Sequence, residues 1–142
     1  MAGSWPYYDN ERWGGPQGGR IPQEQFPGTF ALYHTQVLSG TVDAVLFSRQ
    51  FNIAMFTSTG PDAATLATPG ADDVGKVLML INTNTTQNTV TTAANKITSG
   101  ASSAGDTLTA PAHAGAVAIL VAYNGYWALV VGGTGSWVLS EV

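Results

Sequence analysis

Apolar and polar residues alternate in short runs along most of this chain, and Gly, Pro, Asn and Ser separate the runs. Such runs are typical of half-buried β-strands. Within residues 29–57 the pattern predicts two or three strands. Phe51, Ile53 and Met55 alternate with Asn52, Ala54 and Phe56, although periodicity alone also allows a helix over residues 43–56.

The β pattern is stronger from Gly75 onward. Residues 76–82 are apolar on both faces, as a buried strand would be. Further strands are predicted over residues 89–92, 107–110 and 136–140. Loops are predicted over residues 58–74, where Gly60-Pro61 and Pro69-Gly70 interrupt the pattern, and over residues 99–105.

The clearest element is a β-hairpin over residues 115–131. Its two apolar runs are joined by Asn124-Gly125, the preferred pair for a type I′ turn, in which both central residues need a positive φ. This turn places Tyr123 opposite Tyr126, Val121 opposite Ala128 and Ile119 opposite Val130 on one face. The other face pairs Ala122 with Trp127, Leu120 with Leu129 and Ala118 with Val131. Because neither face is polar, the hairpin is expected in the middle of a sandwich or at a subunit interface.

Together these strands predict an all-β protein whose β-sandwich or jelly-roll-like domain spans residues 29–142, with its strongest module over residues 75–142. Residues 1–28 differ in composition. They combine many Gly and Pro residues with five aromatic residues: Trp5, Tyr7, Tyr8, Trp13 and Phe26. We interpret them as an extended arm that lays its aromatic side chains on another surface. The alternative is an arm that folds back on its own domain.

Composition narrows the classes of function. The chain has 142 residues, enough for one domain, and only 10% of them are charged, against about 25% in typical soluble proteins. Partners that cover much of the surface would explain this deficit, although Thr, Ser, Asn and Gly can also solvate a surface. Five Lys and Arg residues and a formal net charge of -4 argue against nucleic-acid binding. No apolar run approaches the roughly 20 residues of a membrane span.

The sequence contains no recognisable catalytic or metal-binding constellation. There is no Cys, which excludes disulfides and thiolate chemistry. His34 and His113 lie far apart in the chain, and Asp72-Asp73 is interpreted as a turn that caps backbone N–H groups rather than a cation site. We therefore predict a protein that is not an enzyme and has no cofactor, no metal site and no catalytic residues. A small β enzyme is the weakest alternative.

Residues 75–131 resemble a β module that is common in virion proteins of tailed bacteriophages. In that module a Gly-led apolar strand ends in Asn, a Thr/Val strand and a Gly-rich loop follow, and a segment with Leu and Pro precedes an apolar strand, an Asn-Gly turn and a Trp strand. The matching positions are Gly75, Asn82, Val90, Gly100, Leu108, Pro111, Ile119, Asn124, Gly125 and Trp127. Such modules occur in head decoration (cement) proteins, head fibres and tail fibres, and they are typically trimeric.

The resemblance implies a structural protein of the virion, and the short chain favours decoration of the capsid surface. The expected partners are the major capsid protein and two further copies of this chain. The arm residues expected to contact the capsid are Trp5, Tyr7, Tyr8, Arg12, Trp13, Arg20 and Phe26. The residues expected in the hairpin core or trimer interface are Ile119, Val121, Tyr123, Asn124, Gly125, Tyr126 and Trp127.

The alternative function is recognition of a glycan or receptor by a β module of a head fibre or tail fibre. Aromatic rings stack on sugars, and Tyr123, Tyr126 and Trp127 flank the hairpin turn. This hypothesis predicts a sugar-binding face there and an arm that only tethers the module.

Overall fold

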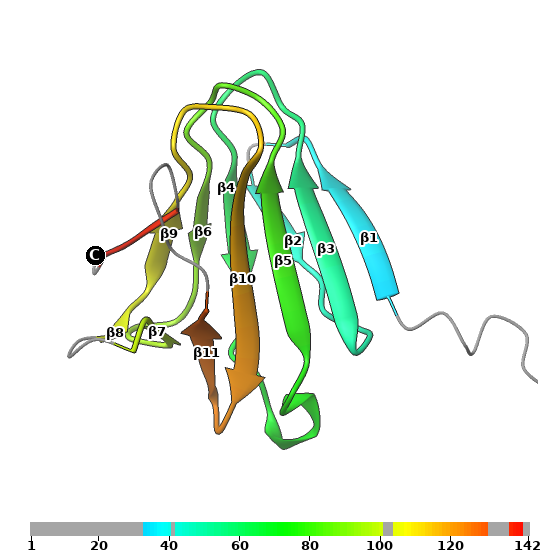
Figure 1. Ribbon diagram of the computed structural model, residues 1–142, viewed down its shortest axis with the longest axis vertical. Helices are drawn as coiled ribbons and strands as arrows, with labels where there is room; N and C mark the ends of the chain where they lie inside the picture. Colours follow the sequence, from blue (N-terminus) through cyan, green and yellow to red (C-terminus); the bar gives the residue numbers. More distant parts are fainter. Residues whose placement is uncertain (1–32, 41, 101–103, 131–136, 141–142) are drawn as a thin grey trace, which may run out of the picture. The chain divides into compact units, whose positions relative to one another are not determined.

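The computed structural model describes residues 33–40, 42–100, 104–130 and 137–140, which form two β-sheets (Figure 1). The seven-stranded sheet contains, in spatial order, β1 (Tyr33–Leu38), β3 (Phe51–Phe56), β5 (Val77–Asn82), β10 (Ala116–Tyr123), β11 (Tyr126–Leu129), β7 (Ile97–Thr98) and β8 (Ala104–Gly105). The five-stranded sheet contains β12 (Val138–Ser140), β9 (Thr107–Thr109), β6 (Thr89–Thr91), β4 (Ala63–Leu66) and β2 (Val42–Val45). A 3₁₀ turn, η2, spans Ala71–Asp73.

From β1 to β6 the chain alternates between the two sheets. As a result β1, β3 and β5 run parallel in one sheet, and β2, β4 and β6 run parallel in the other. We call each passage of the chain from a strand of one sheet, through the other sheet and back to the neighbouring strand of the first sheet, a coil. Tyr33 pairs with Phe51, and Phe51 pairs with Val77, so successive coils span 18 and 26 residues. We call the end of the sandwich where β1, β3 and β5 begin the lower end, as drawn in Figure 1.

The second half of the chain adds mainly antiparallel pairs, although β7 runs parallel to β11. β10 pairs with β5 on one side and with β11 on the other. Asn124 has a φ of 46° and Gly125 a φ of 79°, which confirms the two positive angles predicted for the turn. The predicted pairs Tyr123–Tyr126, Val121–Ala128, Ala122–Trp127 and Leu120–Leu129 are all present. The pair Ala118–Val131 involves a residue outside the described part of the chain.

The core lies between the sheets and is built from alternate residues of each long strand. Side chains at 0–3% exposure include Leu38, Phe56, Leu78, Leu80, Leu120, Trp127 and Trp137 from the seven-stranded side and the C-terminal segment, and Val45, Leu66, Val90 and Leu108 from the five-stranded side. Because side chains alternate between faces along a strand, the residues between these core positions point out of the sandwich.

Buried asparagines tie the connections to the strands. Asn82 donates from Nδ2 to the carbonyl oxygens of Thr86 and Pro111, at 2.9 Å each, and its Oδ1 accepts a hydrogen bond from Asn88 at 3.0 Å. At the lower end, Asn52 donates to the carbonyl oxygens of Arg49 and Val77. These bonds attach the carbonyl groups of connecting residues and of the first residue of β5 to buried side chains.

The all-β, sandwich-like fold is confirmed, and the described residues between 33 and 57 form the predicted strands rather than a helix. The loop predicted over residues 58–74 is wrong, because β4 lies inside it. The inward residues of β4 are Ala64 and Leu66, and its outward residues are Ala63 and Thr65. Because alanine occurs on both faces, the sequence shows little alternation between apolar and polar residues. The parallel first half also differs from a jelly roll, whose strands pair antiparallel.

Candidate interaction surfaces

The outer face of the seven-stranded sheet is mainly apolar, and none of the outward residues described on its five long adjacent strands is charged. It is formed by the outward residues of five adjacent strands: Tyr33, Thr35 and Val37 of β1; Phe51, Ile53 and Met55 of β3; Val77, Met79 and Ile81 of β5; Val117, Ile119, Val121 and Tyr123 of β10; and Tyr126 and Ala128 of β11, followed by Val130. Tyr33 is 62% exposed, Val37 58% and Val130 61%. We refer to these residues as the outer face.

The five-stranded sheet provides an internal comparison. Its outward residues are mainly small or hydroxylated: Ala44 of β2, Ala63 and Thr65 of β4, Thr89 and Thr91 of β6, and Thr109 of β9, with Val138 on the edge strand. Threonine hydroxyls can bond to water, whereas the Ile, Met, Val and Phe side chains of the outer face cannot. The two faces of one sandwich are therefore chemically different.

The structure assigns the hairpin residues, which the sequence analysis placed in one core or interface group, to three different places: the core, the outer face and the turn. Trp127 is fully buried, donates from Nε1 to the carbonyl oxygen of Ala67 at 3.0 Å, and meets Phe47 edge-to-face at a centroid distance of 5.0 Å. Ile119 and Val121 lie on the outer face, and Asn124 and Gly125 form the turn. Trp127 therefore belongs to the core and has no surface to offer to a sugar.

The remaining aromatic pair lies on the outer face beside the turn. The rings of Tyr123 and Tyr126 are 6.2 Å apart and tilted by 35°, and Lys96 Nζ lies 4.7 Å from the centroid of Tyr126. Tyr123 is 43% exposed, and its hydroxyl is 3.2 Å from the Thr98 hydroxyl. Two tyrosines and an ammonium group thus remain at the tip of the hairpin.

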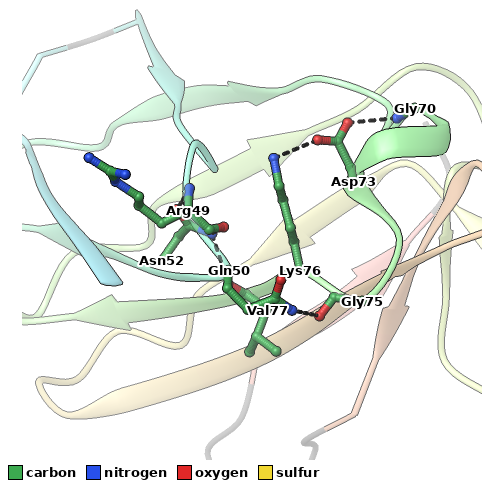
Figure 2. Close-up of polar contacts among 8 residues, drawn as sticks. All are labelled: Arg49, Gln50, Asn52, Gly70, Asp73, Gly75, Lys76 and Val77. Atoms are coloured by element: carbon green, nitrogen blue, oxygen red, sulfur yellow. Dashed lines mark hydrogen bonds and ion pairs between the residues drawn. The ribbon is translucent and has the colours of Figure 1, made fainter. Parts of the chain in front are cut away.

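A groove of about 700 Å³ opens where the strands of the five-stranded sheet reach the lower end. It is lined mainly by apolar atoms, from Ala44, Val45, Leu46, Phe47, Ser48, Thr65, Leu66, Ala67, Asp73, Lys76, Thr91, Thr92 and Ala93. Lys76 forms a 2.7 Å ion pair with Asp73, which also accepts a hydrogen bond from the Gly70 backbone at 2.8 Å (Figure 2). Nothing in the sequence pattern predicted this groove, because its residues come from three separate connections.

The same contacts account for Asp72-Asp73. Asp73 caps the 3₁₀ turn through Gly70, as the sequence interpretation expected, and this bond together with that of Lys76 lowers the pKa of the Asp73 carboxyl. His34 lies on β1 at the lower end, whereas His113 lies in the connection before β10, near Asn82 at the opposite end. Within the described residues, no three His, Asp or Glu side chains are grouped as metal ligands would be.

Asp62 has a buried carboxyl group that the sequence pattern did not indicate. Asp62 is 1% exposed, and neither of its carboxyl oxygens has a hydrogen-bond partner among the residues described. Its backbone is fixed, because its N–H donates to Asn88 Oδ1 and its carbonyl oxygen accepts from Thr89, both at 2.8 Å. Burial raises the pKa of the Asp62 carboxyl, and the neighbouring Asp43 carboxylate raises it further.

The predicted capsid-contact residues of the arm, from Trp5 to Phe26, lie outside the described part of the chain. No protein-family model matches this sequence, and a search of curated proteins finds no match either. None of the described residues belongs to a helix that is long and apolar enough to cross a membrane.

Proposed function

We propose that this protein is a non-enzymatic structural protein of a phage virion that decorates the capsid surface and stabilises it. In this proposal three copies associate, and the assembly binds across neighbouring major capsid subunits. The observation that carries the proposal is the outer face, a broad surface of uncharged and mainly apolar strand residues, whereas the outward residues of the opposite sheet are mainly small or hydroxylated.

The size of the outer face suits an interface. Five strands about 4.8 Å apart and six residues long cover roughly 24 by 20 Å, or about 500 Å² in projection. Monomeric proteins rarely expose larger apolar patches, and patches of this size are often functional. A standard interface buries about 800 Å² on each partner. The outer face therefore fits the centre of an interface, and contacts from the arm would supply the remaining area.

The work of such a protein is mechanical. A protein that binds only the assembled shell stabilises that shell by mass action, in proportion to the logarithm of its concentration over its dissociation constant. No chemical step is needed, which agrees with the resemblance of residues 75–131 to virion β modules.

The first experiment is light scattering on the purified chain, followed by binding to undecorated capsids. A trimer of about 44 kDa, three times the 14.7 kDa chain, is expected. Met79→Lys places a charge at the centre of the outer face and should break the trimer. Thr91→Lys, on the outward side of β6, is the matched control and should not. A monomeric wild type, or a Met79→Lys trimer, would refute the assignment of the face.

The role of the arm is tested separately. Deletion of residues 1–28 should abolish binding to the shell and leave the β domain folded, which circular dichroism can verify. Decoration at full strength by the truncated chain would refute the proposal that the arm contacts the capsid.

The glycan-binding alternative rests on one specific observation, the exposed Tyr123 beside Tyr126 and Lys96 at the hairpin tip. Stacking of a sugar on an aromatic ring needs an exposed ring, and Tyr123 is exposed whereas Trp127 is buried. Glycan-array binding that is lost in Tyr123→Ala, with an unchanged melting temperature, would favour this function over decoration.

A further inference from the structure

Among the described residues, the first strand of each sheet in chain order has no neighbouring strand on its outer side. β1 is the edge of the seven-stranded sheet, and β2 is the edge of the five-stranded sheet. Such edges expose unpaired N–H and C=O groups, and proteins usually protect them with charges, prolines, bulges or a covering segment. The edges of β1 and β2 differ in whether a side chain of the domain bonds to their outward backbone groups.

The edge of β2 is closed by a side chain. Gln36 of β1 donates from Nε2 to the Ala44 carbonyl oxygen at 2.8 Å, and its Oε1 accepts a hydrogen bond from the Leu46 N–H at 2.9 Å. An amide that binds a carbonyl and the N–H two residues further on imitates the peptide group of an adjacent strand. The Ala44 carbonyl of β2 and the N–H of Leu46, just after the strand, are therefore bonded within the domain.

The edge of β1 has no such protection among the described residues. The Leu38 carbonyl oxygen accepts a hydrogen bond from Thr57, so Leu38 directs its backbone groups toward β3. Because alternate residues direct these groups to opposite sides, Tyr33, Thr35 and Val37 direct theirs to the open edge. The sequence of β1, YHTQVL, contains neither Pro nor Lys, Arg, Asp or Glu.

We propose that the open edge of β1 pairs with β1 of a second copy of this chain, antiparallel and around a twofold axis. One register, with Thr35 opposite Thr35 of the second copy and Tyr33 opposite its Val37, satisfies every outward backbone group of the three residues, because each such pair exchanges two hydrogen bonds. Thr–Thr and aromatic–β-branched pairs are also the cross-strand combinations that stabilise sheets. The edge is thus complementary to itself in sequence, in charge and in backbone geometry.

This pairing goes beyond the proposed function and does not depend on it. The edge pairing uses the backbone of β1, whereas the threefold association uses the side chains of the outer face. In the paired state the two outer faces lie side by side in one continuous sheet. Two copies of a decoration protein held in this way would connect neighbouring threefold assemblies.

The test is cysteine cross-linking of the full chain, which has no cysteine of its own. In the proposed register the two Thr35 Cα atoms are about 5.5 Å apart, within the range that a disulfide spans. Thr35→Cys should therefore form a covalent dimer of about 29 kDa, twice the 14.7 kDa chain, under mild oxidation. Val37→Cys is the matched control, since the two Val37 Cα atoms would be about 14 Å apart, too far for a disulfide.

A mixture of the variants Tyr33→Cys and Val37→Cys should give a heterodimer that neither gives alone, because these positions face each other. If Thr35→Cys cross-links no faster than Val37→Cys, the pairing is refuted, whatever the capsid-binding assay shows. A second variant needs no cysteine. Thr35→Pro removes an outward N–H but no bond to β3. In the Met79→Lys background, where the outer-face trimer is broken, it should keep the fold and convert the β1-paired dimer of about 29 kDa into a monomer, as measured by light scattering.

Discussion

The buried Asp62 carboxyl group gives the sharpest prediction about stability. Its pKa is raised in the folded protein, by burial first and by Asp43 second. A group with a raised pKa binds its proton more tightly in the folded state than in the unfolded state. Its contribution to stability is therefore complete below the ordinary carboxyl pKa of about 4 and is lost as the pH rises through the folded pKa. At neutral pH Asp62 should destabilise the fold.

The magnitude follows from the missing hydrogen bonds. Leaving a buried polar group without partners costs roughly 1–3 kcal/mol, and more when the group is charged. Asp62→Asn keeps the shape of the side chain and removes the charge. At pH 7 the free energy of unfolding of this variant should be roughly 1–3 kcal/mol higher than that of the wild type. At pH 3 the protonated aspartic acid and the asparagine are both neutral, and the two proteins should agree within about 0.5 kcal/mol.

Urea unfolding at the two pH values, followed by tryptophan fluorescence, measures the difference. With a urea dependence of about 1–3 kcal/mol per molar, the midpoint should rise by roughly 1 M at pH 7. Both proteins must be compared at one protomer concentration, because association also shifts the midpoint. If Asp62→Asn were less stable than wild type at pH 7, the carboxylate would have a stabilising partner. A gap of equal size at both pH values would show that titration plays no part.

Three further perturbations test separate parts of the structure. Trp127→Ala should lower the free energy of unfolding by roughly 3–5 kcal/mol, because the indole is fully buried, and urea unfolding measures this loss. Asp73→Asn should show the opposite pH dependence to Asp62→Asn. Lys76 lowers the pKa of Asp73, so the variant should lose a few tenths of a kcal/mol at pH 7 and nothing at pH 2, as judged by thermal melting. Gln36→Leu should accelerate hydrogen exchange of the Leu46 amide, measured by NMR, whereas Gln36→Glu keeps the acceptor and should retain more of the protection.

The sequence was most informative where structure is local. The Asn124-Gly125 turn determines the register of its hairpin, because two residues with positive φ leave the strands only one way to pair. The strand at residues 76–82 was predictable for a similar reason, since a continuous apolar run needs cover on both faces. In both cases the residues that decide the structure are adjacent in the chain.

The coiled topology could not be predicted in the same way. Parallel partners lie 18 or 26 residues apart among β1, β3 and β5 and 21 or 26 residues apart among β2, β4 and β6, and no repeated sequence motif aligns them. β4 was missed because alternation between alanine, threonine and leucine is a weak signal. The hairpin showed two apolar faces, and alternation alone cannot tell which of them points into the core. Packing against the five-stranded sheet determines which face is buried, since Trp127 donates a hydrogen bond to the carbonyl oxygen of Ala67, the residue after β4.

The coiled topology also explains why the open edge of β1 lies next to the outer face. In a stack of parallel coils each strand pairs with the next coil, so only the terminal coils have open edges, and such repeats need caps. The later strands β10 and β11 close one side of the seven-stranded sheet beyond β5. The first coil has Gln36 for β2 but no equivalent for β1 among the described residues. A charge or a proline on β1 would have been enough to protect that edge. Its absence from β1, next to an outer face whose outward strand residues are uncharged, is what we expect if β1 pairs with a second copy as proposed.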